Sequence, residues 1–119
     1  MSGSLNMMQV IGHLGADPEV RFTPSGRAVA NFRVATTESW QDSTGKDREE
    51  TEWHRVVAWG KLAEICGEHL KKGRQVYVQG RLKTSPYEKD GQTHYSTEVI
   101  AQTVTFLGPP PKAAANQAA

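Results

Sequence analysis

One segment with helical periodicity lies between stretches that alternate like β-strands, and this order limits the folds open to the chain. Within residues 61–72, side chains recur at helical spacing, namely Leu62, Ile65, Cys66, His69 and Leu70. Gly73 follows at the position where a helix cap is expected. The pattern therefore predicts a single helix over residues 61–72, inserted into a chain of strands.

The other periodic segments predict β-strands. The clearest alternation runs over residues 27–37, where Ala28, Ala30, Phe32 and Val34 take every second position, as in a strand with one buried face. Further strands are predicted at residues 6–14, 51–59, 75–83 and 93–107. Turn-forming residues at 41–47 predict the tip of a long hairpin between the second and third strands, and those at 89–91 predict another hairpin.

Five strands with one helix between the third and fourth follow the order of an OB-fold, a small Greek-key barrel. The 119 residues, 37% of them hydrophobic, leave room for one compact domain with one modest core. We therefore expect residues 1–108 to form a single all-β OB-fold domain with one helix. Residues 109–119 begin with three prolines and contain no large apolar side chain, so we expect a short flexible C-terminal tail.

Several classes of protein are disfavoured by composition. No apolar stretch is long enough to span a bilayer, and the N-terminus lacks the features of a signal peptide. Cys66 is the sole cysteine, which excludes an intrachain disulfide framework and a multi-cysteine zinc site. We therefore expect a soluble, unexported protein in a reducing compartment, without membrane contact.

Charge is distributed unevenly along the chain. The net charge is only +1, but residues 38–52 hold six acids (Glu38, Asp42, Asp47, Glu49, Glu50 and Glu52) against two bases (Lys46 and Arg48), a local net charge of −4. The other residues must therefore carry +5. A small barrel with such segregation can present a positive face to a polyanion without a basic total.

Motifs for catalysis are missing from the sequence. Gly60 and Lys61 resemble the end of a phosphate-binding loop, but Arg55 and Leu62 stand where that loop needs glycine and a hydroxyl residue. Cys66 and His69 share a predicted helix face, yet two ligands do not make a zinc site, and a packed core thiol is favoured. We expect no enzyme, no metal and no cofactor. A small metal-dependent hydrolase is the alternative, which bound metal and turnover would reveal.

All three tryptophans, Trp40, Trp53 and Trp59, lie in or beside the predicted long hairpin. On the strand over residues 51–59, one face carries Trp53, Arg55, Val57 and Trp59, and the other carries His54, Val56 and Ala58. Arginine is rare in a core row, so the face with the tryptophans is expected to be open to solvent or to a partner. The opposite face is expected to line the barrel.

Exposed indoles beside cationic side chains suit single-stranded nucleic acid, because the rings stack on unpaired bases while the cations neutralise phosphates. Tyr87 near the second turn is a further candidate platform, and Phe22 between Arg21 and Thr23 is a weaker one. An ordinary core or a protein contact is the alternative interpretation of these aromatics.

A family resemblance covers residues 5–108. Six motifs closely resemble those of bacterial-type single-stranded DNA-binding proteins (SSBs). They are Gly12-His-Leu-Gly-Ala-Asp-Pro-Glu-Val-Arg21, Ala35-Thr-Thr-Glu-Ser-Trp40, Thr51-Glu-Trp-His-Arg-Val-Val57, Gly60-Lys-Leu-Ala-Glu64, Leu70-Lys-Lys-Gly73 and Val76-Tyr-Val-Gln-Gly-Arg-Leu-Lys-Thr84. The resemblance implies an OB-fold, usually a homotetramer, in the bacterial cytoplasm with the nucleoid. It also implies a non-enzymatic protein that binds single-stranded DNA (ssDNA) without strong sequence preference and protects it in replication, recombination and repair.

The same resemblance assigns candidate site residues. The stacking aromatics of the family fall on Trp40, Trp53, Trp59 and Tyr87; the family commonly has phenylalanine at position 59 and tryptophan at position 87. Candidate phosphate contacts are Arg21, Arg33, Arg55, Lys61 and Lys72. His54 corresponds to a family histidine at the subunit interface.

The C-terminus departs from the family pattern, in which an acidic, hydrophobic tip recruits replication and repair enzymes. No acid follows Glu98, so we do not expect recruitment of such partners through a tip. A truncated form and a naturally short relative, from a plasmid, a phage or another mobile element, both fit the sequence. Two further alternatives are an SSB-like primosomal or plasmid-maintenance barrel that chiefly binds proteins, and an OB-fold RNA binder.

Overall fold

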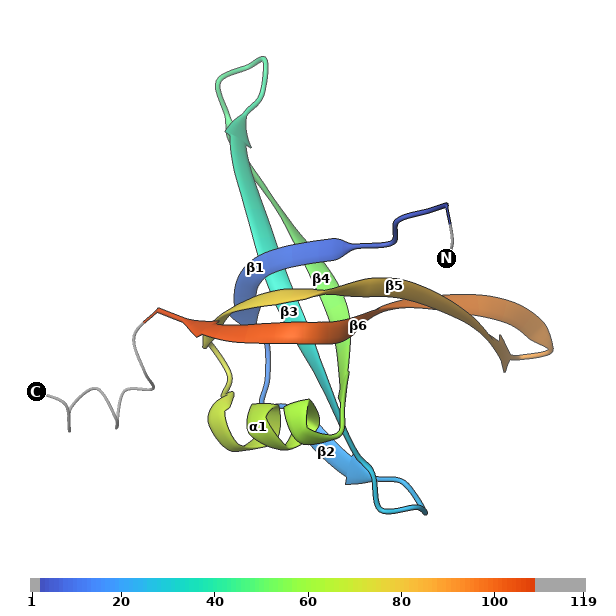
Figure 1. The fold of residues 1–119 in the computed structure, drawn as a ribbon. Helices are drawn as coiled ribbons and strands as arrows, with labels where there is room; N and C mark the ends of the chain where they lie inside the picture. Colours follow the sequence, from blue (N-terminus) through green and yellow to red (C-terminus); the bar gives the residue numbers. More distant parts are fainter. Residues whose placement is uncertain (1–2, 109–119) are drawn as a thin grey trace, which may run out of the picture.

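The computed structural model describes residues 3–108, so the predicted tail over residues 109–119 lies outside the described part. Residues 3–108 form six strands and one helix (Figure 1). These are β1 (Met8–Leu14), β2 (Glu19–Phe22), β3 (Ala28–Gln41), β4 (Asp47–Trp59), α1 (Lys61–His69), β5 (Gln75–Lys89) and β6 (Gln92–Leu107). No helix within residues 3–108 has the length and apolar character needed to cross a membrane.

Five of the strands close into a barrel. They are hydrogen-bonded in the order β1, β5, β6, β4, β3, and the pairing of Leu14 in β1 with Val34 in β3 closes the ring. β4 and β6 run parallel, and the other neighbours run antiparallel. This closed barrel with one helix confirms the predicted OB-fold. β2 is an additional edge strand on β3 that the sequence analysis missed, because its four residues are too few to show a period.

The core follows the predicted alternation. Ala28, Ala30, Phe32 and Val34 of β3 are all buried, and the intervening side chains are not. Apolar residues of the other strands and of the helix complete the core, among them Val56, Ala58, Ala63, Cys66, Leu70, Val76 and Val78. The opposite pleat of β3 and β4 is thereby left outside the barrel, where its side chains can meet a ligand.

Helix α1 ends earlier than predicted. It stops at His69, and Leu70 is extended (φ −87°, ψ 140°) while its N–H still donates to the Cys66 carbonyl. Gly73 is therefore not the helix cap. Its positive φ of 86° serves a later turn, in which its N–H donates to the Leu14 carbonyl at 2.8 Å. The predicted helix ran too far because Lys71 and Lys72 are compatible with either structure.

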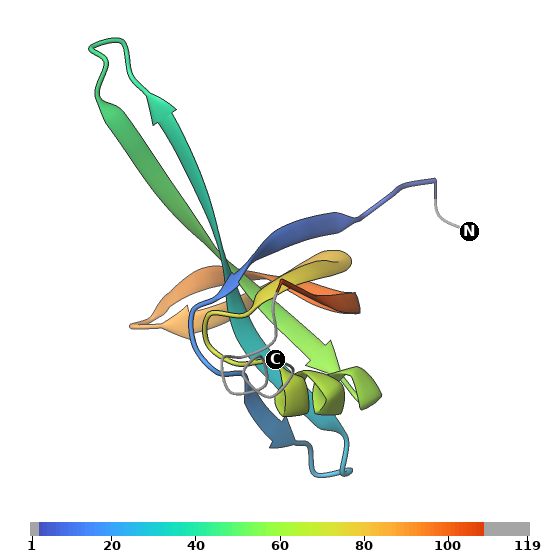
Figure 2. The ribbon, with the colours of Figure 1, turned by 90° about the vertical axis from the view of Figure 1, so that its left-hand side faces the viewer.

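Two hairpins extend beyond the barrel (Figures 1 and 2), and both are longer than predicted. β3 and β4 stay paired as far as Gln41 and Asp47, and β5 and β6 as far as Lys89 and Gln92. The outer parts are polar and lack a buried face, so hydrophobic alternation alone could not show them. Backbone pairing, rather than burial, holds these segments in register.

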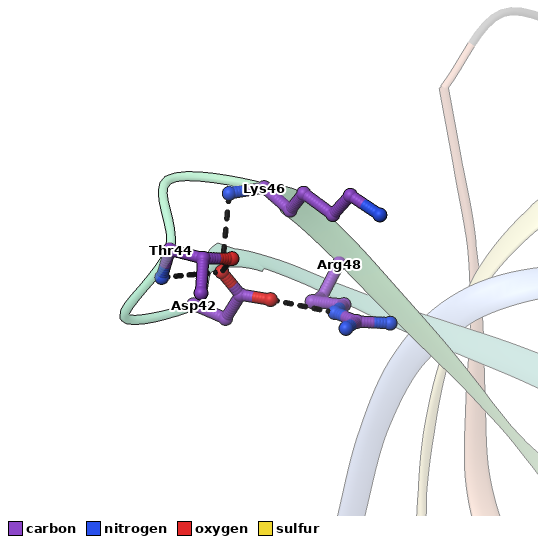
Figure 3. A network of polar contacts seen from close by, with 4 residues as sticks. All are labelled: Asp42, Thr44, Lys46 and Arg48. Carbon is purple, nitrogen blue, oxygen red and sulfur yellow. Dashed lines mark hydrogen bonds and ion pairs between the residues drawn. The ribbon is translucent and has the colours of Figure 1, made fainter.

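Asp42 organises the tip of the β3–β4 hairpin (Figure 3). Its Oδ1 accepts hydrogen bonds from the N–H of Thr44 at 2.9 Å, the hydroxyl of Thr44 at 2.6 Å and the N–H of Lys46 at 3.1 Å, and its Oδ2 pairs with Arg48 at 2.9 Å. The hydrogen bonds from Thr44 and Arg48 stabilise the carboxylate and lower the pKa of Asp42 to about 2. This network fixes the turn at residues 42–46.

Candidate nucleic-acid interface

A continuous trough crosses the outer surface of the barrel. It consists of two hollows, of about 600 and about 320 Å³, that share Arg33, Trp53 and Arg55. The larger hollow also touches the segment after β1 and the start of β2, and the smaller one continues onto β5 and β6. Its other lining residues are Gly15, Ala16, Asp17, Glu19, Arg21, Asn31, Phe32, Tyr87, Tyr95, Ser96, Thr97 and Glu98.

Trp53 lies at the junction of the two hollows, and its side chain is 54% exposed. It sits opposite Ala35 on the outward pleat of the hairpin, as the alternation predicted. The indole also approaches Gly15, where a Cβ would overlap its ring carbons and lie 2.8 Å from Cη2. Gly15 therefore allows the chain after β1 to form a wall beside the ring. The result is an accessible aromatic surface in a defined position.

Arg33 and Arg55 occupy directly opposite positions on β3 and β4, next to Trp53. The side chain of Arg55 donates to the Ser96 hydroxyl at 3.2 Å. Among residues 3–108, neither guanidinium has an acid within ion-pairing distance. Like charges in opposite positions of a sheet repel each other, so an anion bound between them would be favourable.

The trough also holds acids, which limits its positive field. Glu19 pairs with Arg21, and Asp17 accepts the backbone N–H of Lys72 at 2.8 Å. Glu98 is half-buried, and its Cα lies opposite that of Lys83. Three arginines and three acids therefore line the trough, so base stacking must supply a large part of any affinity for a nucleic acid. The arginines would position the phosphates locally.

Tyr87 lines the smaller hollow and is 48% exposed. It lies within β5 rather than in a loop beside the turn, because β5 continues through Pro86 to Lys89. Its ring stacks on His94 of β6, with centroids 5.5 Å apart and an angle of 26°. One face of the tyrosine is therefore covered by its neighbour, and the other is available to a base.

Trp59 is exposed on the same outward pleat but lies outside the trough. The guanidinium of Arg27 lies over the Trp59 ring, 5.0 Å from its centroid. Across the sheet, Val29 of β3 lies between Trp59 of β4 and Arg21 of β2. Val57, in the same row, is buried, which the prediction of an open row did not anticipate. On the opposite row, Val56 and Ala58 are buried as predicted.

Trp40 and Phe22 are not brought to the trough. Trp40 is exposed on the projecting hairpin and lines a separate hollow of about 520 Å³ with Ser39, Gln41, Asp47, Arg48 and Glu49. Phe22 pairs with Ala28 and shares its face of β2 with Val20, the neighbour of Gly67 in α1. That face is opposite to the face of Arg21. Among the aromatic residues predicted as stacking platforms, only Trp53 and Tyr87 line the trough.

Lys61 and Lys72 are exposed at the two ends of the helical segment. Lys61 begins α1, and the backbone contact to Asp17 places Lys72 near one end of the trough. His54 is half-buried, and its Nε2 lies 2.9 Å from the Thr36 hydroxyl. Its place at a subunit interface stays a prediction.

Cys66 is a fully buried core residue, and burial raises the pKa of its thiol to about 11. His69 is exposed, with its ring centroid 5.6 Å from that of Phe106. Across the described part of the chain, no three metal-ligating side chains gather into one group.

The sequence analysis missed Gly15, Tyr95, Ser96 and Glu98. Gly15 gave no signal, since its role depends on a neighbour distant in sequence. Tyr95 and Ser96 could have been found by counting back from the turn at residues 89–91, because antiparallel pairing sets them opposite Pro86 and Ser85.

Known proteins are similar to this chain in sequence and in fold. Residues 5–107 match the Single-strand binding protein family. The Single-stranded DNA-binding protein 1 of Chlorobaculum tepidum is 53% identical over 110 residues, which cover 91% of this chain and 68% of that protein. The SSB of Plasmodium falciparum, solved in a complex with ssDNA, superimposes with a TM-score of 0.83 at 34% identity, over 91% of this chain and 99% of that chain.

A deletion mutant of the single-stranded DNA binding protein from Thermus aquaticus superimposes with a TM-score of 0.75 at 36% identity, over 87% of this chain. This chain spans about half of that protein, 51% of its length. The family match covers nearly all of the described barrel, and the two solved relatives share its fold. The chain therefore belongs to the single-strand binding protein family.

Proposed function

We propose that this protein binds and protects single-stranded DNA without sequence preference, in replication, recombination and repair. The observation that carries the proposal is the continuous trough, in which the exposed Trp53 lies next to Arg33 and Arg55, two arginines without an acid partner among residues 3–108. Membership of the family and the ssDNA complex of the Plasmodium relative support it.

Stacking on aromatic rings makes the binding general and selective for unpaired strands. Every base has a π-face, so Trp53 and Tyr87 accept any base, and each stack contributes about 1–3 kcal/mol as measured by alanine substitution. Bases in a duplex are already stacked on each other and are not available to the rings. Arg33 and Arg55, which lie opposite each other next to Trp53, neutralise phosphates beside the stacked base. Binding of this kind needs no cofactor and no turnover.

A homotetramer of 13.1 kDa chains is part of the proposal. Its support is the family resemblance together with two exposed apolar side chains, Met7 just before β1 and Ile11 within β1. We assign His54 to a subunit interface on the same resemblance. Light scattering of the purified protein tests the assembly. The bacterial relative supports a place in the bacterial cytoplasm, with the nucleoid.

Titration with oligo-dT tests the function. Tryptophan emission should be quenched on binding, and a duplex of the same length should compete poorly. An oligo-U titration separates an RNA binder from a DNA binder, since a clear preference for the ribose strand would favour RNA. Equal affinity for duplex and single strand, or no binding at all, would refute the proposal.

A further inference from the structure

Tyr95 is the aromatic residue of β6 that no other group engages. Its side chain is 69% exposed, more than any other aromatic side chain in the described part of the chain. Within residues 3–108, its hydroxyl has no hydrogen-bond partner and its ring has no aromatic neighbour. An exposed and unpartnered ring of this size is a candidate contact for a ligand.

The position of Tyr95 points to the ligand of the trough. It lines the smaller hollow together with Trp53, Tyr87 and the two arginines. Tyr87 has one face covered by His94, whereas both faces of Tyr95 are free of aromatic neighbours within the described residues. Ser96 and Thr97, which follow it, also line this hollow, and the Ser96 hydroxyl accepts a hydrogen bond from Arg55 at 3.2 Å.

We infer that Tyr95 is a further stacking platform, which takes an unpaired base of the strand after that strand has passed Trp53. The inference rests on the proposed function and extends it, since it adds a second aromatic platform, besides Tyr87, on the β5–β6 hairpin. A contact of Tyr95 with a second copy of this chain is the competing explanation.

A series of substitutions at one position separates stacking from other roles. Tyr95→Phe keeps the ring, Tyr95→Leu keeps apolar volume without a π-face, and Tyr95→Ala removes both. Affinity for oligo-dT should stay within about twofold in Tyr95→Phe and fall about 5- to 150-fold in the other two. Thermal unfolding should be nearly the same for all three, because the side chain is exposed.

Trp53→Ala, measured beside the series, distinguishes two kinds of failure. If wild-type protein does not bind oligo-dT, the proposed function fails. If Trp53→Ala weakens binding and Tyr95→Leu does not, the function stands and the inference about Tyr95 is overturned. The inference is likewise overturned if the Tyr95 variants change only the assembly seen by light scattering.

Photo-crosslinking provides a direct second measurement. An oligo-dT that carries 5-iododeoxyuridine should crosslink to a peptide containing Tyr95, as detected by mass spectrometry after digestion, in the wild type and not in Tyr95→Leu. Crosslinks confined to peptides that contain Trp53 or Tyr87 would overturn the inference, whatever the affinities show.

Discussion

Gly15 lies against the indole of Trp53 so closely that a single methyl group on Gly15 would overlap the ring. The two residues belong to different parts of the barrel, the segment after β1 and the middle of β4. The wall of the trough and its central ring are therefore fitted to each other. An alteration of the wall should act on DNA through the indole.

Gly15→Ala should weaken ssDNA binding by displacing Trp53. Overpacking of this kind typically costs about 1–3 kcal/mol, and the indole can relieve it by leaving its rotamer. We expect the affinity for oligo-dT to fall about tenfold, which corresponds to about 1.4 kcal/mol. In a Trp53→Ala background the same substitution should cost little, because the ring is absent.

Gly3→Ala is the matched control for that double-mutant cycle, since a Cβ on Gly3 meets nothing within 4 Å. Equal losses from Gly15→Ala with and without Trp53 would show that the glycine serves another purpose.

Arg33→Gln and Arg55→Gln should each make the salt dependence of binding shallower. Each phosphate neutralised on a single strand adds about −0.7 to the slope of log K against log salt concentration. Removal of one arginine should thus reduce the steepness of that slope by about 0.7, equally for oligo-dT and for mixed sequences. Lys46→Gln, at the hairpin tip, serves as the control cation. An unchanged slope in both arginine variants would exclude them as phosphate ligands.

Removal of either arginine should not destabilise the free protein. The two arginines occupy opposite positions, and neither has an acid in ion-pairing range among the described residues. Removal of either one therefore relieves the repulsion between two like charges. The melting temperature of Arg33→Gln should equal or exceed that of the wild type. A marked decrease would mean that the side chain supports the fold.

The hairpin tip should lose its order only in strong acid. The pKa of Asp42 is lowered from 3.8 to about 2, so the folded tip favours the carboxylate. Its stabilising contribution is complete above the ordinary pKa of 3.8 and is lost as the pH falls through about 2. The amide signals of Thr44 and Lys46 in NMR spectra should therefore shift with a midpoint near the lower value. A midpoint close to 3.8 would mean that the network is not formed in solution.

Cys66 should resist thiol reagents in the native protein. Burial raises its thiol pKa from 9.0 to about 11, which leaves almost no thiolate at about pH 8, and the side chain is fully covered. Ellman's reagent should react at the slow rate of unfolding, and rapidly once urea is added. Rapid modification without urea would place the thiol at the surface.

The sequence predicted the barrel wherever one face of a strand is buried. The alternation from Ala28 to Val34 indicated the core of β3 directly, and the row of Trp53 and Arg55 indicated the outward face of β4. Both hairpins were predicted, but their strands were predicted too short and the strand β2 was missed, because pairing there is stabilised by backbone hydrogen bonds and leaves no periodic burial to detect.

Proximity in three dimensions was harder to predict than exposure. Trp40 and Trp53 lie in one hairpin, yet its length carries Trp40 away from the trough. Tyr95 and Gly15, in contrast, reach the trough from distant parts of the sequence. Closure of the barrel decides these positions, and closure depends on long-range pairing that a local pattern does not encode.

A protein in which Trp53 is the only tryptophan tests the central role of this ring most directly. Trp40→Phe and Trp59→Phe together leave its indole as the only one, and titration with oligo-dT at several salt concentrations then reports contact at the trough alone. Emission should be quenched in step with binding, because the stacked base lies on that ring. Binding that proceeds with no change in the emission of Trp53 would contradict the proposed path of the DNA.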